Sequence, residues 1–481
     1  MVSQIGLLSK GSQSRSGCVM IKIVGVDIGS SAIKACCFDF PDDDQPRLTK
    51  KYIEKCQLLR PQAGWVEHNL QKMESLLENL IDQIEVGSPL SFTSAMHSLV
   101  ILNPAGQPLT NAISWADSRS AKQAIYLKEK FPQHHQRTGT PIHPMAWPAK
   151  LSWLRLRRPV WWNQIARVTD LKAFLLERLM GRPMPMDLSN ASATGLWDQK
   201  EQCWDRELLA ELELPENCLP EVQTGVEPFM WKGRQVFLGG GDGPLGNLGV
   251  GAVVDKRVAM SVGTSGALRQ LETSDGPLPS SLFRYAIDHE LAVRGAAISN
   301  GTSVLDWLCQ QYKATLDDVL SWVESADTGA NGLKIYPYFQ GERAPFWSPE
   351  KTAAVLGLNF QHQPADVARA AVEGVAFCLR RLYQELEPGD EPIRCTGGFF
   401  ASPSWVQLLA NVLGKPLAVS PIEEATSLGA ALLALEGYRE HSAALPAGAV
   451  TEPDLVQTAV YDELFEDWVA EEPGLSKSST G

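Results

Sequence analysis

The sequence predicts an α/β protein of two lobes, on three observations. The chain has 481 residues, whereas a single hydrophobic core stops growing at roughly 250 to 300 residues. Its composition, 44% apolar and 21% charged, is that of an ordinary globular protein. A unit of strands, a glycine turn and a later helix occurs twice along the chain. Together these observations predict two α/β lobes with a cleft between them and a seam around residues 246–256.

The first copy of this unit begins near residue 21. The β-branched run 21–27 predicts a strand that ends in the turn Gly29-Ser30-Ser31, and residues 32–40 predict the returning strand. We expect a third strand at 52–59 and a helix at 70–84.

The second copy repeats this order. A strand at 258–262 runs into Gly263-Thr264-Ser265, followed by strands at 267–271 and 291–297 and a helix from about residue 303. Two copies are too few for a solenoid, so we interpret the halves as distant duplicates.

The clearest single element is a helix at 364–386, with apolar residues three and four apart and Pro364 near its start. The predicted domains are residues 20–245 and residues 246–445, followed by an acidic tail at 446–481. A short helix is expected at 463–468.

Charge and cysteine content exclude several classes of protein. The chain carries 43 Lys and Arg against 56 Asp and Glu, a net charge of −13, which argues against general nucleic-acid binding. No stretch approaches the ~18 apolar residues of a membrane helix. Residues 1–19 lack the apolar core of a signal peptide and are expected to be a disordered extension, with Met20 as the hypothesised start. Nine cysteines without C-x-x-C spacing indicate reduced thiols in a cytoplasmic protein.

The two glycine turns are candidate phosphate sites. Glycine has no Cβ, so the backbone N–H groups beside Gly29 and Gly263 can approach a phosphate closely. Each turn alone is more typical of an ordinary tight connection, and the pair in a duplicated unit is the stronger indication of phosphate binding. The G-x-x-x-x-G-K-[ST] motif is absent, which excludes a P-loop protein.

Two aspartates are candidates for the chemistry. Asp27 ends the first strand and would hold Mg²⁺ through water, or serve only as a strand-end turn residue. Asp242, in the run Gly239-Gly240-Gly241-Asp242-Gly243, follows a hydrophobic strand and is the candidate general base for phosphoryl transfer to a hydroxyl. Asp-Gly is also a common turn pair, and that alternative stays open.

Further along the chain, Thr396-Gly397-Gly398 lies between a predicted strand and helix, where a nucleotide would meet bare backbone. A tight structural connection is the alternative. Glu342 and Arg343 are also candidates, with a local ion pair in a solvated loop as the plainer interpretation.

These features together resemble the FGGY family of carbohydrate kinases, over about residues 20–440. The most specific match is AAVLGLNFQHQPADVARAAVE at 353–373, which satisfies the family's C-terminal signature. The resemblance implies an actin-like, ribonuclease-H-like two-lobed ATPase fold with duplicated domains and a central cleft. It also implies lobe closure around the substrates.

Within the family, five segments resemble gluconate kinases more than xylulose or glycerol kinases: SAMHSLV at 94–100, SWADSRS at 114–120, TGTPIHPM at 138–145, GDGPLGNLG at 241–249 and GERAPFW at 341–347. The implied activity is transfer of the γ-phosphoryl group of ATP, with Mg²⁺, to the terminal hydroxyl of D-gluconate. The partner is thus a small sugar acid, with no nucleic acid or membrane, and a homodimer is left open.

The resemblance also implies a role for individual residues. Asp242 would be the base, and the anionic sugar would meet cations or donors. The resemblance makes residues 20–245 the sugar side and residues 246–445 the nucleotide side, and it implies that Met96, His97 and Asp242 meet the sugar. Because gluconate is anionic, the cations or donors among the substrate-binding candidates are His97, Arg119, His143 and Lys150. His143 could instead be a packed histidine, and Arg119 could serve a helix start. The implied ATP- and phosphate-binding residues are Gly29, Ser30, Ser31, Lys34, Gly263, Thr264, Gly301, Gly397, Gly398 and Ser402, with Asp27 holding the metal through water.

Two positions depart from the family pattern. The N-terminal signature expects Pro, Ser or Thr three residues before Lys150, but Trp147 stands there, which affects the expected sugar-pocket wall. Gluconate kinases usually read Phe-Ala-Arg-Ser after the late Gly-Gly, whereas residues 399–402 lack the arginine. The alternatives are therefore another FGGY sugar or polyol kinase, xylulokinase first, or a non-catalytic nucleotide- or sugar-binding protein of this fold.

Overall fold

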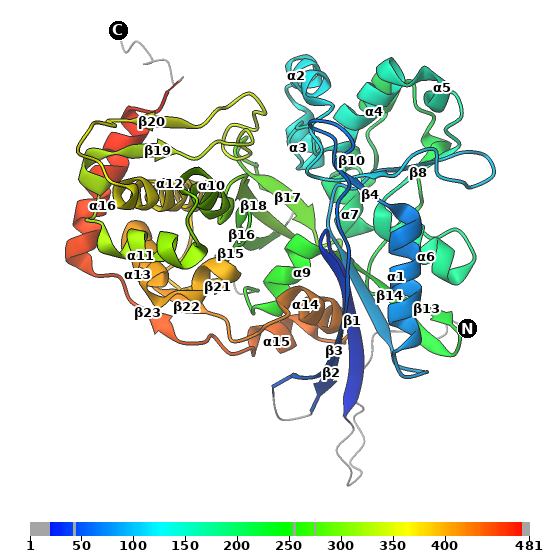
Figure 1. The fold of residues 1–481 in the computed structure, drawn as a ribbon. Helices are drawn as coiled ribbons and strands as arrows, with labels where there is room; N and C mark the ends of the chain where they lie inside the picture. Colours follow the sequence, from blue (N-terminus) through cyan, green and yellow to red (C-terminus); the bar gives the residue numbers. More distant parts are fainter. Residues whose placement is uncertain (1–19, 42–44, 254–255, 274–275, 474–481) are drawn as a thin grey trace. The chain divides into compact units, whose positions relative to one another are not determined.

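The computed structural model describes residues 20–41, 45–253, 256–273 and 276–473. These residues form two units, each built of a sheet with helices (Figure 1). Of the described residues, unit 1 comprises 20–41, 45–253, 270–273, 276–294 and 422–446, and unit 2 comprises 256–269, 295–421 and 447–473. The predicted extension at 1–19 lies outside the described residues.

A mixed six-stranded sheet in the order β13-β14-β5-β1-β2-β3 is the centre of unit 1. Its strands are β1 (Ile21–Ile28), β2 (Ala32–Phe40), β3 (Arg47–Lys55), β5 (Leu90–Ser94), β13 (Pro228–Trp231) and β14 (Arg234–Gly241). β1 pairs antiparallel with β2 and parallel with β5, and β14 pairs parallel with β5. The first two predicted strands are confirmed. The third strand was predicted at 52–59, whereas β3 covers Arg47–Lys55. It is a mostly exposed edge strand, so little apolar alternation marks its start in the sequence.

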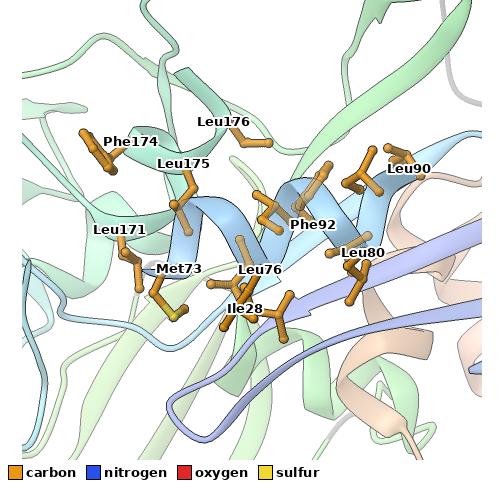
Figure 2. Packing of buried hydrophobic residues seen from close by; sticks show 14 of the residues in the cluster. Ile28, Met73, Leu76, Leu80, Leu90, Phe92, Leu171, Phe174, Leu175 and Leu176 are labelled. Carbon is orange, nitrogen blue, oxygen red and sulfur yellow. The ribbon is translucent and has the colours of Figure 1, made fainter. Parts of the chain in front are cut away.

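One face of this sheet is covered by α1 (Leu70–Asp82) and α6 (Leu171–Met180). Figure 2 shows Leu76 and Leu80 of α1 beside Ile28 of β1 and Phe92 of β5, with the leucines of α6 above them. The helix at 70–84 is confirmed as α1, and the side chain of Asn69 caps it by accepting the N–H of Lys72 at 2.9 Å.

The opposite face is covered by α14 (Ala425–Leu433), whose Leu428 and Leu432 pack on Ile23, Cys36 and Phe237. α14 also crosses α9 (Asp242–Gly249) at very short range. A Cβ on Gly249 would lie 1.7 Å from the carbonyl oxygen of Ala425, so only glycine allows the approach.

Unit 1 also contains further short strands and helices, of which β17 is the edge strand next to β18 (Leu291–Ile298) (Figure 1). The strands are β4 (Glu67–His68), β6 (Val100–Leu102), β7 (Ala112–Ile113), β8 (Arg167–Thr169), β9 (Met186–Asp187), β10 (Trp197–Asp198), β11 (Cys203–Trp204), β12 (Val222–Gln223) and β17 (Phe283–Ala286). The helices are α2 (Ala121–Lys130), α3 (His134–Thr138), α4 (Trp147–Arg157), α5 (Pro159–Trp162), α7 (Leu188–Ala193), α8 (Arg206–Leu212), η1 (Glu216–Cys218) and α15 (Tyr438–Ala443).

The units differ from the predicted contiguous domains in three segments. Residues 246–253, 270–294 and 422–445 were expected in the second domain, and all three segments belong to unit 1. The last of these segments carries α14. Its burial depends on contacts with β1, about 400 positions earlier, and with α9, about 180 positions earlier, which no local pattern indicates.

Unit 2 contains the strands β18 (Leu291–Ile298), β16 (Gly266–Thr273), β15 (Val258–Val262), β21 (Ile393–Thr396), β22 (Leu417–Val419) and β23 (Val450–Thr451), neighbours in this order, although β16 and β18 each extend into unit 1. β15 pairs parallel with β21. A separate antiparallel pair is formed by β19 (Lys334–Tyr336) and β20 (Ala354–Leu356).

The helices of unit 2 are α10 (Ser303–Tyr312), α11 (Leu316–Ser325), η2 (Ala330–Gly332), α12 (Pro364–Glu385), η3 (Gly398–Ala401), α13 (Pro403–Leu413) and α16 (Leu455–Ala470). The predicted helix at 364–386 is confirmed as α12. The short helix expected at 463–468 is part of the much longer α16, whose Tyr461, Phe465 and Trp468 are buried. The described part of the acidic tail therefore packs on unit 2 up to residue 473.

Candidate active site

The first glycine turn joins β1 to β2 and brings Asp27 opposite Lys34. The two residues are paired in the antiparallel register, and the N–H of Gly29 donates to the carbonyl of Ala32 at 3.0 Å. Nζ of Lys34 lies 2.9 Å from Oε2 of Glu424. The turn thus carries one carboxylate and one ammonium beside exposed backbone, which is suited to binding a charged phosphate.

The serines of this turn are placed differently from one another. Ser30 Oγ accepts a hydrogen bond from Nε1 of Trp115 at 3.1 Å. The carbonyl of Ser31 accepts the N–H of Cys56 at 2.9 Å, and the Ser31 residue itself is exposed. Trp115 therefore fixes one of the two predicted phosphate-binding hydroxyls.

Asp242 lies at the junction of β14 and α9, in the first turn of that helix. Asp242 and Asp27 lie near enough for their charges to interact: burial first, and then the charge of Asp242, raises the pKa of Asp27 to about 7, against the opposing effect of Lys34. The structure therefore brings together the two aspartates that were singled out from the sequence.

The predicted sugar-binding residues Met96 and His97 follow β5. Met96 packs against Gly241, where a Cβ would lie 2.7 Å from its Cε atom, so it adjoins the turn that carries Asp242. His97 has a φ of 65°, in the left-handed region, and its Nδ1 lies 2.8 Å from the carbonyl of Ala193. Because that carbonyl can only accept, the hydrogen-bond network assigns the proton to Nδ1.

The other ring nitrogen of His97 faces a residue that was not predicted. Nε2 lies 3.4 Å from the hydroxyl of Tyr285, whose side chain comes from β17 and is only 4% exposed. With the proton on Nδ1 alone, Nε2 is the acceptor for this hydroxyl. Ala193 and Tyr285 together fix the orientation and tautomer of His97.

Arg119, predicted to be a substrate-binding cation, pairs with two carboxylates of the protein itself. Its side chain is 1% exposed and bonds to Asp117 and to Glu67, in both cases at 2.7 Å. It also stacks 3.7 Å above the ring of Trp65. The charge of Arg119 is therefore neutralised inside the protein.

Lys150, also predicted to bind the substrate, is buried and bonds to the protein backbone. Its Nζ donates to the carbonyl of His97 at 2.6 Å, and burial lowers its pKa to about 7. It thus holds the backbone of the His97 turn. Trp147, the departure from the family signature, donates from Nε1 to the carbonyl of Ser98 at 3.0 Å and supports the same turn. His143 is half-buried, and its Nδ1 accepts the N–H of Met145 at 3.3 Å.

The predicted nucleotide-side residues gather in unit 2. The N–H of Gly301 donates to the carbonyl of Thr264 at 2.8 Å, and the N–H of Thr302 donates to that of Gly263 at 2.7 Å. A Cβ on Gly301 would lie 2.5 Å from the carbonyl oxygen of Gly263. The turn after β15 and the turn after β18 therefore lie directly against each other.

The late glycine pair joins this cluster through β21, the neighbour of β15. Gly397 has a φ of 109°, and a Cβ there would lie 2.3 Å from the carbonyl oxygen of Val262. Gly398 has open space where its Cβ would be. Ser402 lies next to α13, and its Oγ is 2.8 Å from that of Ser404, which donates to Glu324 of α11 at 2.6 Å.

Glu342 and Arg343 are not the solvated loop pair that was one interpretation of the sequence. Glu342 is buried, and its Oε1 accepts the N–H groups of Ser299 and Arg343 at 2.6 and 2.8 Å. Arg343 donates to the carbonyl of Ile298 at 2.6 Å. Both residues hold the segment that leads from β18 to Gly301, which is a structural role.

A magnesium ion fits the aspartates only together with other ligands. Within the described ranges, no group of three or more His, Cys, Asp and Glu residues could hold a metal. Two neighbouring carboxylates, one with a raised pKa, are a suitable anchor for a hard cation that keeps water and takes phosphate oxygens. The donor set thus fits Mg²⁺ bound largely through water and phosphate.

Comparison with known proteins decides the family. Residues 22–230 match the N-terminal domain of the FGGY family of carbohydrate kinases, and residues 258–437 match its C-terminal domain. The chain belongs to this family. FGGY kinases use ATP as the phosphate donor and a small sugar as the acceptor, so the protein is a carbohydrate kinase.

Relatives of this FGGY kinase include gluconate and xylulose kinases. It is 31% identical to the gluconokinase of Bacillus subtilis, over 86% of this chain and 87% of the relative. It is 27% identical to a xylulose kinase of Staphylococcus epidermidis, over 86% and 88% of the two chains.

The solved structures that resemble this chain also include a gluconate kinase and a xylulose kinase. A gluconate kinase from Lactobacillus acidophilus matches with a TM-score of 0.86 and 28% identity, covering 94% of this chain and 97% of that one. A ligand-bound xylulose kinase from the same organism also has a TM-score of 0.86 and 28% identity, over 93% and 97%. The expected actin-like α/β fold class is confirmed. Among the helices that the structure describes, none has the length and apolar character needed to cross a membrane.

Two residues of the FGGY kinase site were missed from the sequence. Glu424 and Tyr285 both lie in segments that return to unit 1 late in the chain. Neither belongs to a motif, so no sequence signal identified them. Trp115 was within a quoted segment, SWADSRS, but its contact with Ser30 required the fold.

Proposed function

We propose that this FGGY kinase phosphorylates D-gluconate with MgATP to give 6-phospho-D-gluconate. The observation that carries the phosphoryl-transfer part is the pairing of Asp27 and Asp242 beside Lys34. The choice of gluconate is supported by the likeness to gluconokinases at 31% identity and by the five gluconate-kinase-like segments.

Asp242 would act as the general base. Transfer of a phosphoryl group to an alcohol needs a positioned hydroxyl, charge neutralisation and a group that takes the hydroxyl proton. A carboxylate at the start of a helix is held in one place by the preceding strand. We therefore assign to Asp242 the removal of the proton from the terminal hydroxyl of the sugar.

The turn at Asp27 would serve the phosphates. Magnesium, when bound, supplies neutralisation of phosphate charge, and Asp27 would hold it through water. Lys34, with Ser30, Ser31 and the N–H groups around Gly29, would contact phosphate oxygens. In unit 2 the turns at Gly263, Thr264 and Gly301 would contact the triphosphate, and Gly397, Gly398 and Ser402 would border the nucleoside.

Recognition of the sugar acid falls to fewer residues than the sequence suggested. Arg119 and Lys150 are committed to protein groups. The remaining candidates are Met96 and His97, together with His143. The hydroxyl of Tyr285, which is fixed by His97, is a further candidate for contact with a sugar hydroxyl.

A second FGGY activity, on xylulose, is favoured by two observations. The xylulose kinase of L. acidophilus matches the fold as well as the gluconate kinase does. The burial of Arg119 and Lys150 also removes two of the cations that made an anionic substrate attractive.

The test is ADP release by the purified protein with MgATP and each of D-gluconate, D-xylulose, D-ribulose and glycerol. We expect kcat/KM for gluconate to exceed that for the others by at least about 100-fold, the discrimination that a site with dedicated polar contacts provides. Preferred turnover of xylulose would keep the kinase and overturn the substrate. Binding of ATP and sugar without turnover would favour the non-catalytic alternative.

A further inference from the structure

The strand that carries the proposed base is irregular just before Asp242. The pairing of β14 with β5 shifts register between Phe237 and Gly240. Gly239, inside the irregular stretch, has a φ of 65°, and a Cβ there would lie 1.8 Å from the carbonyl oxygen of Phe92. A bulge of this kind redirects the residues that follow it, and its carbonyl groups need partners outside the regular ladder.

One buried lysine supplies those partners. Nζ of Lys172, on α6, donates to the carbonyl of Leu238 at 2.8 Å and to the carbonyl of Gly240 at 3.0 Å. Its third neighbour is Oδ2 of Asp187, at 2.9 Å. The ammonium has three donors, and these three acceptors account for all of them.

The ion pair is fully enclosed by protein. The side chains of Lys172 and Asp187 are each 1% exposed. Taking both charges out of water is costly, and apolar side chains of similar volume would often give equal or greater stability. The position of this pair under the bulge therefore calls for a reason other than stability.

A second contact fixes the same stretch from α7. Asp187 caps this helix by accepting the N–H of Asn190 at 2.9 Å. Two residues after Asp187, Ser189 Oγ accepts the N–H of Gly241 at 3.1 Å. The backbone of residues 238–241 is thus held by α6 through Lys172 and by α7 through Ser189, immediately before Asp242.

We propose that Lys172 and Asp187 are positioning residues for catalysis, which fix the bulge in β14 and thereby the carboxylate of Asp242. This inference rests on the proposed function of Asp242 as the base. Neither side chain contacts the substrate. Their effect is on the placement of the base relative to the sugar hydroxyl, so they act on kcat and leave the affinities for sugar and ATP unchanged.

The test compares Lys172→Met with wild type and with Glu177→Gln, a control on the same helix. Glu177 pairs with Arg167 at 2.7 Å and has no bond to β14. We expect Lys172→Met to lower kcat about 10- to 100-fold, the cost of misplacing a reacting group by roughly 1 Å, with both KM values within twofold of wild type. Glu177→Gln should keep wild-type kcat.

A purely structural role would lower the unfolding temperature of Lys172→Met without changing kcat per folded molecule, and that result would overturn the proposal. If Lys172→Met does not fold, Ser189→Ala is the test variant. It removes the hydroxyl that accepts the N–H of Gly241 and leaves the ion pair of Lys172 and Asp187 intact. A several-fold lower kcat at unchanged KM supports the proposal, and an unchanged kcat overturns it.

Asp242→Asn is measured in parallel so that the two proposals fail separately. If Asp242→Asn keeps wild-type kcat, the assignment of the base is wrong and the positioning role is lost with it. If Asp242→Asn abolishes turnover while Lys172→Met or Ser189→Ala does not lower it, only the positioning role is overturned.

Discussion

Nζ of Lys34 lies 2.9 Å from Oε2 of Glu424, a residue 390 positions later in the chain. Glu424 also pairs with Lys51, on the neighbouring strand. The late segment that carries α14 therefore does more than cover the sheet. It places a carboxylate between two lysines beside the first glycine turn and restrains the ammonium that faces Asp27.

We expect Glu424→Gln to lower the free energy of unfolding by about 1 kcal/mol, a small value because both lysines are about a third exposed. Burial acts to raise the pKa of Glu424, but the two lysines outweigh it and hold this pKa below its usual value. The stabilisation is thus present at neutral pH and is lost as the pH falls through the lowered pKa. Urea unfolding at pH 7 measures it. The same substitution is then made in a protein that carries Lys34→Met and Lys51→Met. If Glu424→Gln lowers the free energy of unfolding there as much as in the wild-type protein, the stabilisation does not come from these ion pairs.

Lys150→Met tests the support of the His97 turn. The ammonium donates to the carbonyl of His97, which has left-handed backbone geometry. Without it the turn relaxes, and we expect the KM for the sugar to rise about tenfold, the value of one hydrogen bond to a charged group, with the KM for ATP unchanged. Steady-state kinetics with the exposed Lys122→Met as control measures this. An unchanged sugar KM would show that the contact does not matter for binding.

The neighbouring glycines 397 and 398 form a matched pair. Gly397→Ala should cost about 1 to 3 kcal/mol of stability, because its φ is positive and the carbonyl of Val262 occupies the space of the Cβ. Gly398→Ala has open space and should leave stability unchanged, yet weaken ATP binding if the nucleotide approaches this backbone. Thermal unfolding and ATP titration separate the two effects. Equal stability of the two variants would contradict the structural distinction.

Two buried histidines make the protein sensitive to acid. Burial lowers the pKa of His68 and of His134 to about 4. In the unfolded chain both histidines bind a proton near pH 6.5, whereas in the folded chain they bind one only near pH 4. The free energy of unfolding therefore has its full value above pH 6.5 and decreases as the pH falls below it. At pH 5 we expect each histidine to cost about 2 kcal/mol relative to pH 7.

The measurement for this prediction is the difference in unfolding free energy between pH 7 and pH 5. His134→Gln should reduce that difference by about 2 kcal/mol. If His134→Gln keeps the wild-type pH dependence, the ring is not held neutral in the folded protein.

The parts of the site that local patterns predict are those made by consecutive residues. The strands around Gly29 and Gly263 are confirmed because each turn and its flanking β-branched runs are adjacent in sequence. Asp242 was found in the same way, as the residue after a hydrophobic strand. The fold class followed from the repetition of these units.

The features of the site that the sequence did not reveal depend on the burial of side chains and on contacts between segments far apart in the chain. Arg119 and Lys150 are cations in a sugar-side segment, and charged residues are normally exposed, so nothing local indicates that both are enclosed. Tyr285 meets His97 across 188 positions. Nothing in the sequence around Lys172 distinguishes it from other lysines near the start of a helix. The fold brings its ammonium group to the carbonyls of β14.

The most direct test of the account is the turnover of Asp242→Asn with MgATP and D-gluconate, measured as ADP release beside wild type. The substitution keeps the size of the side chain and removes the base. We predict that kcat falls by about 100- to 10,000-fold, the usual contribution of general-base catalysis, while ATP still binds with wild-type affinity. Wild-type turnover by Asp242→Asn would contradict the assignment of this carboxylate as the base.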